Sequence, residues 1–245
     1  MKDRFSAHAS QYATFRPSYP DRLVEFVIKH CRGHARAWDC GTGNGQLAVK
    51  LSPYFQQVCA TDASAKQIEN AISVSNINYI VQPAEQTNFP DSYFDLISVA
   101  QAIHWFDLGR FYLEVKRVSK PGAVLAVIGY SPLRAGAEFD QIIDDFYFNV
   151  INPYWDTERK LVDDRYQSLA FPFQEIQVPA FQMNYVWTKK QVEGYLSSWS
   201  AVQTYIQKNH INPVIEVMKK LERCWTAEKR AVYFPIFMRM GLVYL

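Results

Sequence analysis

Ala35-Arg-Ala-Trp-Asp-Cys-Gly-Thr-Gly-Asn-Gly-Gln-Leu-Ala-Val49 is the stretch around which this chain is organised, and three glycines stand at alternate positions within it. The pattern predicts a buried strand over residues 35–40, a turn over residues 41–45 and a helix that begins near Gln46. Glycine lets the backbone turn sharply and leaves no side chain between the backbone and a ligand. Because the helix would point its free N–H groups at the same space, we expect a ligand-binding loop here.

Two acidic residues mark the ends of the first two predicted strands. Asp39 lies just before Gly41, and Asp62 follows the apolar run over residues 58–61. In nucleotide-binding βαβ units a ribose-binding carboxylate stands about twenty residues beyond the glycine loop, where Asp62 falls. We therefore expect an adenosine-containing cofactor across the ends of these two strands.

The composition narrows the class of protein. The chain has 245 residues, 49% of them hydrophobic and 15% aromatic, which suits one large α/β domain. A net charge of +2 is far from the basic excess of a nucleic-acid binder, so no nucleic acid is expected as a partner. No apolar run is long enough to span a bilayer and no apolar signal segment is present, so no membrane is expected either.

The cysteines and histidines point to neither disulfides nor a metal. The four cysteines form no close pair and have no metal-type spacing, which favours a reducing, cytoplasmic setting. His30, Cys31 and His34 straddle a predicted helix end, and no further cluster completes a ligand set. We therefore expect no metal.

Alternating strand and helix patterns predict the fold class, an α/β protein with a doubly wound, Rossmann-like sheet of seven mostly parallel strands. After a helix over residues 21–30, further strands are expected over residues 57–61, 78–82, 93–100 and 123–130, with helices over 64–73 and 107–118. Residues 119–122 would close the last of these helices. Ligands bind such sheets beyond the carboxyl ends of the strands.

The whole chain, residues 1–245, is expected to form a single domain. Residues 1–34 would supply an N-terminal lid and helix, and residues 35–130 the cofactor-binding core. Residues 131–172 and part of 188–224 are rich in aromatic side chains and would form an inserted cap that faces the substrate. One or two strands broken by Pro179 are expected over residues 174–187, and a final strand over 232–244. The aromatic leader over residues 1–20 either packs on the domain or closes over the cofactor.

The spacing of the glycines favours one nucleotide cofactor over another. A dinucleotide site prefers Gly-x-Gly-x-x-Gly with a pyrophosphate on the helix N-terminus, whereas this chain has Gly41-x-Gly43-x-Gly45. The carboxylate of Asp39 is poorly placed beside a pyrophosphate. It suits the cationic amino-acid end of S-adenosylmethionine (SAM), so we expect SAM rather than NAD.

The chain resembles the class I SAM-dependent methyltransferases of the methyltransferase type 11 group, and it is similar to their small-molecule branch around trans-aconitate methyltransferases. The stretches that carry the resemblance are Trp38-Asp-Cys-Gly-Thr-Gly-Asn-Gly45, Thr61-Asp-Ala-Ser64, Ala84-Glu85, Phe94-Asp-Leu-Ile97, Ala102-Ile-His-Trp-Phe-Asp107, Lys120-Pro-Gly122, Tyr12…Arg16-Pro-Ser-Tyr-Pro20 and Trp187-Thr…Tyr195-Leu-Ser-Ser-Trp-Ser200. One mild departure is Cys40, where many relatives carry a small apolar residue.

The resemblance implies a role for each of the matching positions. The implied cofactor contacts are Tyr12 and Arg16 for the carboxylate, Asp39, Gly41, Thr42 and Gly43 for the methionine part, Asp62 for the ribose, Ala63, Ala84 and Glu85 for the adenine, and Gln101 for the methyl end. The implied activity is transfer of a methyl group to a small-molecule acceptor.

The acceptor and its chemistry stay open at this stage. A carboxylate acceptor needs no general base, while a hydroxyl or an amine does, and His104 is the base candidate. The alternative for His104 is a structural residue that starts the next helix. Trp105 and Arg134 are the candidate acceptor contacts. Two rival functions also remain, a catalytically silent SAM-fold scaffold and an NAD-linked oxidoreductase, and the oligomeric state is unknown.

Overall fold

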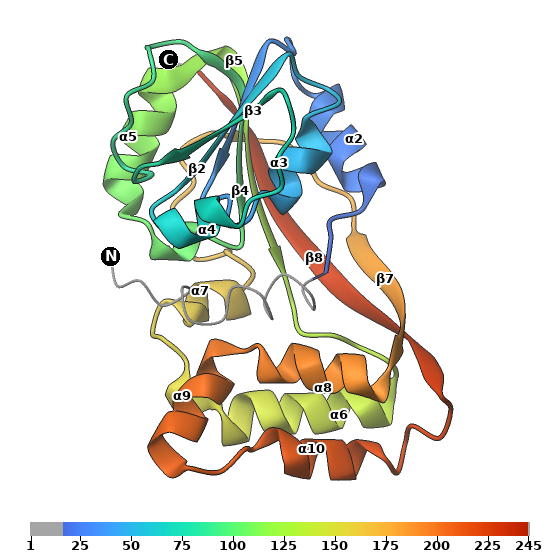
Figure 1. Cartoon of the computed structure of the whole chain (residues 1–245). Helices are drawn as coiled ribbons and strands as arrows, with labels where there is room; N and C mark the ends of the chain where they lie inside the picture. Colours follow the sequence, from blue (N-terminus) through green and yellow to red (C-terminus); the bar gives the residue numbers. More distant parts are fainter. Residues whose placement is uncertain (1–16, 245) are drawn as a thin grey trace.

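One sheet of eight strands runs through the part of the chain that the structure, a computed structural model, describes, namely residues 17–244. The strands are β1 (Arg36–Cys40), β2 (Gln57–Asp62), β3 (Ile77–Val81), β4 (Phe94–Ala100), β5 (Ser119–Tyr130), β6 (Gln174–Glu175), β7 (Phe181–Thr188) and β8 (Lys229–Val243). Their order is β3-β2-β1-β4-β5-β8-β6, and β7 pairs with β8 outside this path. The doubly wound α/β fold is therefore confirmed (Figure 1).

The strand directions place a ligand site at one edge of the sheet. Strands β1 to β5 are mutually parallel, and β8 runs antiparallel to β5. The chain builds outward from β1 through β2 to β3, and then returns to the other side of β1 with β4. At such a reversal the loops after the two central strands separate and open a crevice at their carboxyl ends.

The number of strands differs from the seven expected. The segment over residues 174–187 forms two strands because Pro179 has no N–H for a sheet ladder. Strand β6 pairs with the end of β8 at Leu242 and Gly241, and β7 pairs with the first half of β8. With 15 residues, β8 is long enough to pair with both.

Helices cover both faces of the parallel part of the sheet. They are α2 (Asp21–Lys29), α3 (Gln46–Leu51), α4 (Ala65–Glu69) and α5 (Leu108–Val118). Because side chains alternate along a strand, Ala37 packs into the core cluster of α2 and α3, whereas its neighbour Trp38 packs into that of α5. Residues 119–122 continue into β5 rather than forming the expected turn, because Ser119 pairs with Phe94 before a register shift.

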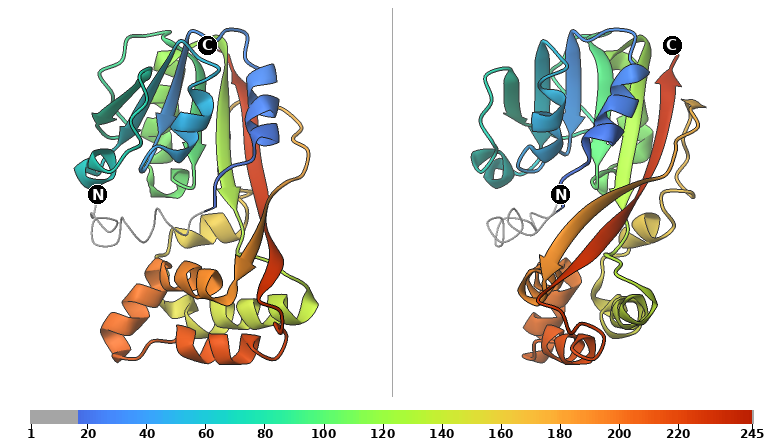
Figure 2. Two further views of the ribbon diagram at one scale, coloured as in Figure 1. Left: turned by 45° about the vertical axis from the view of Figure 1, so that its right-hand side comes forward. Right: turned by 90° about the vertical axis from the view of Figure 1, so that its right-hand side faces the viewer.

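A second group of helices lies beyond the carboxyl ends of the strands. It consists of α6 (Ala137–Asp145), the short turns η2 (Phe146–Val150) and η3 (Asn152–Tyr154), α7 (Arg159–Asp163), α8 (Lys189–Ser197), α9 (Ser200–Asn209) and α10 (Val214–Leu221). Strands β7 and β8 run out of the sheet as a ribbon to these helices, and α7 lies between them and the sheet (Figures 1 and 2). We call this group the cap.

Aromatic packing joins the cap to the sheet. The ring of Trp199 stacks on Phe146 and meets Tyr147 edge-on, while Phe234 of β8 contacts Trp187 and Tyr195. These side chains belong to the same buried cluster as the residues under α2 and α3, so cap and sheet share one core. None of the helices among residues 17–244 is both long and apolar enough to cross a membrane.

Candidate functional site

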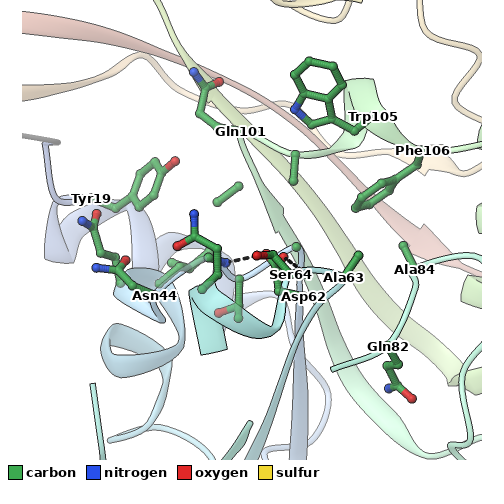
Figure 3. Close-up of a pocket in the computed structure, with 18 of the residues that line it drawn as sticks. Tyr19, Asn44, Asp62, Ala63, Ser64, Gln82, Ala84, Gln101, Trp105 and Phe106 are labelled. Atoms are coloured by element: carbon green, nitrogen blue, oxygen red, sulfur yellow. Dashed lines mark hydrogen bonds between the residues drawn. The ribbon is translucent and has the colours of Figure 1, made fainter. Parts of the chain in front are cut away.

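A pocket of about 780 Å³ opens at the carboxyl ends of β1, β2 and β4 (Figure 3), and Glu158 of the cap also lines it. The residues singled out in the sequence that line it are Gly41, Thr42, Gly43, Asp62, Ala63, Ala84, Gln101 and Trp105. Tyr12 and Arg16 lie outside the described residues. Asp39, Glu85, His104 and Arg134 are described but are not part of the pocket lining.

The three glycines of the loop after β1 serve different purposes. All three have a positive φ, +67° at Gly41, +58° at Gly43 and +88° at Gly45. Residues other than glycine adopt such backbone angles only at a cost in free energy. A Cβ on Gly41 would stand 2.5 Å from the Cβ of Ala102, and one on Gly45 would collide with the Tyr79 ring. A Cβ on Gly43 would meet nothing nearer than Gln67 Oε1 at 3.9 Å, so only at Gly43 does the missing side chain leave pocket space.

Asp62, at the end of β2, is fixed by two backbone donors. Its Oδ2 accepts from the Gly43 N–H and its Oδ1 from the Ser64 N–H, each at 2.9 Å. A carboxylate oxygen has two lone pairs and can accept more than one hydrogen bond. The glycine loop and the start of α4 therefore hold one oriented carboxylate on the pocket wall.

Asp39 lies beneath the glycine loop, out of direct contact with the pocket. Its Oδ2 accepts from the Thr42 hydroxyl at 2.5 Å and its Oδ1 from the Ser98 hydroxyl at 2.8 Å. Only 1% of its surface is exposed, and this burial raises the pKa of its carboxyl to about 6. Asp39 therefore reaches the pocket through Thr42, which does line it.

Gln101 follows β4 with a left-handed backbone, at a φ of +54°. A non-glycine residue in this region costs about 1 to 3 kcal/mol and is often found where a site demands it. Two bonds hold the conformation, because the Gln101 N–H donates to Ile128 O at 2.8 Å and its Oε1 accepts from the Tyr130 N–H at 3.2 Å. The side chain is thereby tied to the end of β5 within the pocket wall.

His104 is buried beside the pocket rather than in it. It lies on the short helix η1 (Ile103–Trp105), with Nδ1 3.2 Å from the Tyr166 hydroxyl. Burial, with a smaller effect of the Arg159 charge, lowers its pKa to about 3. The imidazole is therefore neutral at pH 7 and a weak base, and this placement fits the structural alternative for His104.

Glu85 and Arg134 also have partners elsewhere. The Oε1 atom of Glu85 accepts from the Asp107 N–H at 3.0 Å, on a shallow adjoining hollow rather than the main pocket. Arg134 pairs with Asp144 at 2.7 Å on the cap side of the molecule. Neither side chain faces the main pocket.

Several lining residues were not singled out in the sequence as site residues. They include Tyr19 before α2, Gln82 after β3, Phe106 after η1, Tyr130 at the end of β5, and Glu158 in the cap. Gln82 and Tyr130 follow the rule that strand ends carry the site, which could have found them. Nothing in the sequence pattern places Glu158 there, because it reaches the pocket from a segment far along the chain.

Comparisons with known proteins decide the family. A sequence profile described as "Methyltransferase domain" matches residues 38–127. A candidate methyltransferase of Dictyostelium discoideum is 31% identical, and the match covers 96% of this chain and 93% of that protein. The chain belongs to the SAM-dependent methyltransferases.

Other relatives of this methyltransferase agree. A candidate type II methyltransferase from Anaeromyxobacter dehalogenans has a TM-score of 0.88 and 35% identity, covering 94% of this chain and 99% of that one. A Saccharomyces cerevisiae protein named for SAM-dependent methyl transfer is 25% identical over 86% of this chain and 84% of its own length. The fold is the class I, Rossmann-like methyltransferase fold, and the cofactor is SAM.

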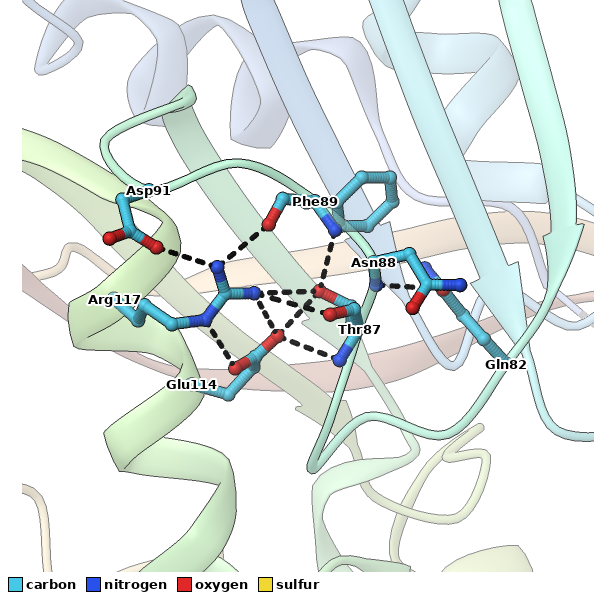
Figure 4. A network of polar contacts seen from close by, with 7 residues as sticks. All are labelled: Gln82, Thr87, Asn88, Phe89, Asp91, Glu114 and Arg117. Atoms are coloured by element: carbon cyan, nitrogen blue, oxygen red, sulfur yellow. Dashed lines mark hydrogen bonds and ion pairs between the residues drawn. The ribbon is translucent and has the colours of Figure 1, made fainter.

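The methyltransferase holds the loop after β3, which carries the pocket residue Ala84, with an ion pair between buried Glu114 and partly exposed Arg117 (Figure 4). Glu114 of α5 accepts from the Thr87 N–H at 2.8 Å and from the Arg117 guanidinium at 2.8 Å. Arg117 also donates to Asp91 Oδ1 at 2.7 Å. The loop is thereby fastened to α5 at Thr87 and at Asp91.

Proposed function

We propose that this chain transfers the methyl group of SAM to a small-molecule acceptor held between the glycine loop and the cap. The observation that carries this proposal is the pocket of about 780 Å³ that Asp62 and the cap residue Glu158 both line. Pockets of this size suit small ligands. Since SAM itself takes part of the volume, the space left favours a small acceptor.

The polar atoms of the pocket support the proposed placement of SAM. Ser64 and Gln82 are polar residues of the pocket lining, as Asp62 is. A nucleoside carries hydroxyl and amino groups that form hydrogen bonds with such a polar wall. We assign Asp62 to the ribose, Ala63 and Ala84 to the adenine, and the loop over residues 41–43 with Gln101 to the methionine end.

SAM supplies an activated methyl group, so the protein mainly has to bind, orient and exclude water. Gln101, tied to the Tyr130 backbone, fixes one wall where the reacting groups would meet. His104 is outside the pocket lining, which argues against direct removal of an acceptor proton by its imidazole. Arg134 is already paired, and the described lining has no lysine or arginine, so a carboxylate acceptor gains no support.

Titration with S-adenosylhomocysteine (SAH) followed by assay of methyl transfer tests the proposal. Micromolar SAH binding together with methylation of a small acceptor would support it. Binding of SAH without transfer to any small acid, phenol or amine would favour the silent scaffold instead. As part of this proposal we assign the enzyme to the cytoplasm, because Cys31, Cys40, Cys59 and Cys224 are free thiols, and we assign it no nucleic-acid partner.

Replacing Asp62 by alanine is expected to weaken SAH binding by at least about tenfold, since hydrogen bonds to a charged group are worth roughly 1.5–3 kcal/mol. Asp62→Asn keeps one carbonyl acceptor and should lose less. Calorimetric titration of both variants, with thermal unfolding as the check on folding, measures the effect. An unchanged affinity in Asp62→Ala would remove Asp62 from the ribose site.

Binding of SAH is expected to weaken about tenfold between pH 7 and pH 5, through Asp39. With a pKa of about 6, this carboxyl is mostly ionised at pH 7 and mostly protonated at pH 5. The ligand ammonium favours the ionised form, so binding at pH 5 must also remove a proton. Titrations at both pH values measure this, and Asp39→Asn should give a flat profile. An equally flat wild-type profile would show that the ionisation of Asp39 does not affect cofactor binding.

A further inference from the structure

The charged side chains that the described residues 17–244 contribute to the pocket have one sign. Among the described residues that line it, only Asp62 and Glu158 carry a formal charge, and both are acidic. Asp62 is held by the glycine loop and belongs to the cofactor side. Glu158 comes from the cap, so of these two carboxylates it is the one assigned to the acceptor side.

Arg159, the neighbour of Glu158 in the sequence, is anchored in the cap. The Arg159 Nε donates to the Tyr147 hydroxyl at 2.7 Å, and its guanidinium lies 4.6 Å from the centre of a Trp155 ring. Asp163, one turn along α7, lies 3.7 Å away from the same group. Arg159 is therefore anchored inside the cap and outside the pocket lining, while Glu158, at the start of α7, lines the pocket.

Aromatic side chains form much of the remaining wall around the acceptor space. They are Tyr19, Trp105, Phe106 and Tyr130. The rings of Tyr19 and Tyr130 meet edge-on, with centroids 6.4 Å apart, so they form one continuous surface. The faces of aromatic rings attract cations, and a carboxylate beside them adds a charged hydrogen-bond acceptor.

We propose that Glu158 binds the acceptor and that the acceptor is a small organic amine. This inference rests on the proposed function and adds the substrate class to it. The amine enters as an ammonium, held by Glu158 and the aromatic wall. It gives one proton to the Glu158 carboxylate, which passes it to water, because a nitrogen needs a free lone pair to attack.

The transfer then balances in atoms and charge. The nitrogen lone pair forms the new N–CH₃ bond, and the electrons of the broken S–CH₃ bond stay on sulfur, which gives neutral sulfide in SAH. The product leaves as a methylated ammonium. The net reaction releases one proton, and Glu158 is exposed enough to hand it to solvent.

Three probes of one shape test the charge preference, 2-phenylethylamine, 2-phenylethanol and 3-phenylpropionate. Each is titrated into the SAH-loaded enzyme, and each is assayed with SAM for SAH formation. We expect the amine to bind and react, and the anion to do neither. Glu158→Gln should lower kcat/KM for the amine by about tenfold or more while SAH affinity is unchanged. Glu158→Lys should favour the anion in binding.

Glu138→Gln is the matched control, because Glu138 is an exposed glutamate of the cap on α6, outside the pocket. It should leave both SAH and amine binding unchanged. Preference of the wild type for the anion or the alcohol, or binding of none of the probes, would overturn the inference. An equal loss of SAH affinity in Glu158→Gln would do the same and assign Glu158 to the cofactor. Failure of the wild type to bind SAH would instead overturn the proposed function.

Discussion

The Gly43→Val protein is expected to fold and to lose affinity for SAH by more than about a hundredfold, equivalent to about 2.7 kcal/mol. The loop glycines differ in what surrounds them, and only the Cβ position of Gly43 opens on the pocket. A valine there would place two methyl groups in the volume assigned to the methionine end. Its positive φ adds strain of about 1 to 2 kcal/mol, which is small beside the stability of a domain.

Calorimetric titration with SAH and thermal unfolding of the same samples check this prediction. Gly109→Ala is the control, because Gly109 lies in α5 and an added Cβ would meet Asp107 Oδ1 at an ordinary 3.5 Å. That variant should bind SAH normally. Gly45→Ala should instead lose stability, since its Cβ would collide with the Tyr79 ring. A Gly43→Val protein that bound SAH like the wild type would show that this loop is not at the cofactor.

The parallel core could be predicted because local pattern and burial agree there. Every residue of β1 after Arg36 is buried, as is every residue of β4 before Ala100, so both strands read as near-continuous apolar runs. The positions of the glycine loop and of Asp62 could be predicted from the order of strand, turn and helix in the sequence. The number of strands formed by residues 174–187 could not be predicted. It depends on the length of β8, because both β6 and β7 pair with that strand.

The site was less predictable where it depends on tertiary packing. The sequence places Asp39 beside the glycines, but not beneath them, where hydroxyls of Thr42 and Ser98 cover both of its oxygens. His104 follows a strand end, yet Tyr166, from a segment far along the chain, covers it. Glu158 reaches the pocket from the cap, where its neighbour Arg159 is bound to Tyr147. Each of these positions is set by contacts between distant segments, which no local pattern encodes.

Replacing Glu114 by alanine is expected to lower the free energy of unfolding by about 3 kcal/mol at neutral pH. Glu114 is buried with 7% of its surface exposed, and it joins Thr87 of the loop after β3 to Arg117 (Figure 4). Removing it leaves the guanidinium without its main partner and frees the Thr87 N–H. The loss of unfolding free energy should lie at the low end of the range for buried ion pairs. Arg117 is partly exposed, and it still has its ion pair with Asp91 in the variant.

The pH dependence of this stabilisation has a definite sign. Burial alone would raise the pKa of Glu114, but hydrogen bonds from Arg117 and Thr87 outweigh it and hold the pKa below 4.5. A carboxyl with a lowered folded-state pKa stabilises the fold above its unfolded-state pKa. The difference between wild type and Glu114→Ala should therefore be full at pH 7 and shrink as the pH falls through and below 4.5.

Urea unfolding at pH 7 and pH 4 measures both effects, with Glu216→Ala as the matched control. Glu216 forms the same i,i+3 type of pair with Lys219, but both side chains are mainly exposed, so its loss should change stability by less than about 0.5 kcal/mol. Because the Glu114 pair fastens the loop that carries Ala84, Glu114→Ala should also weaken SAH binding in the protein that remains folded. A stability loss as small as that of Glu216→Ala would mean that solvent reaches this pair, and that the adenine-side loop is held by its apolar contacts instead.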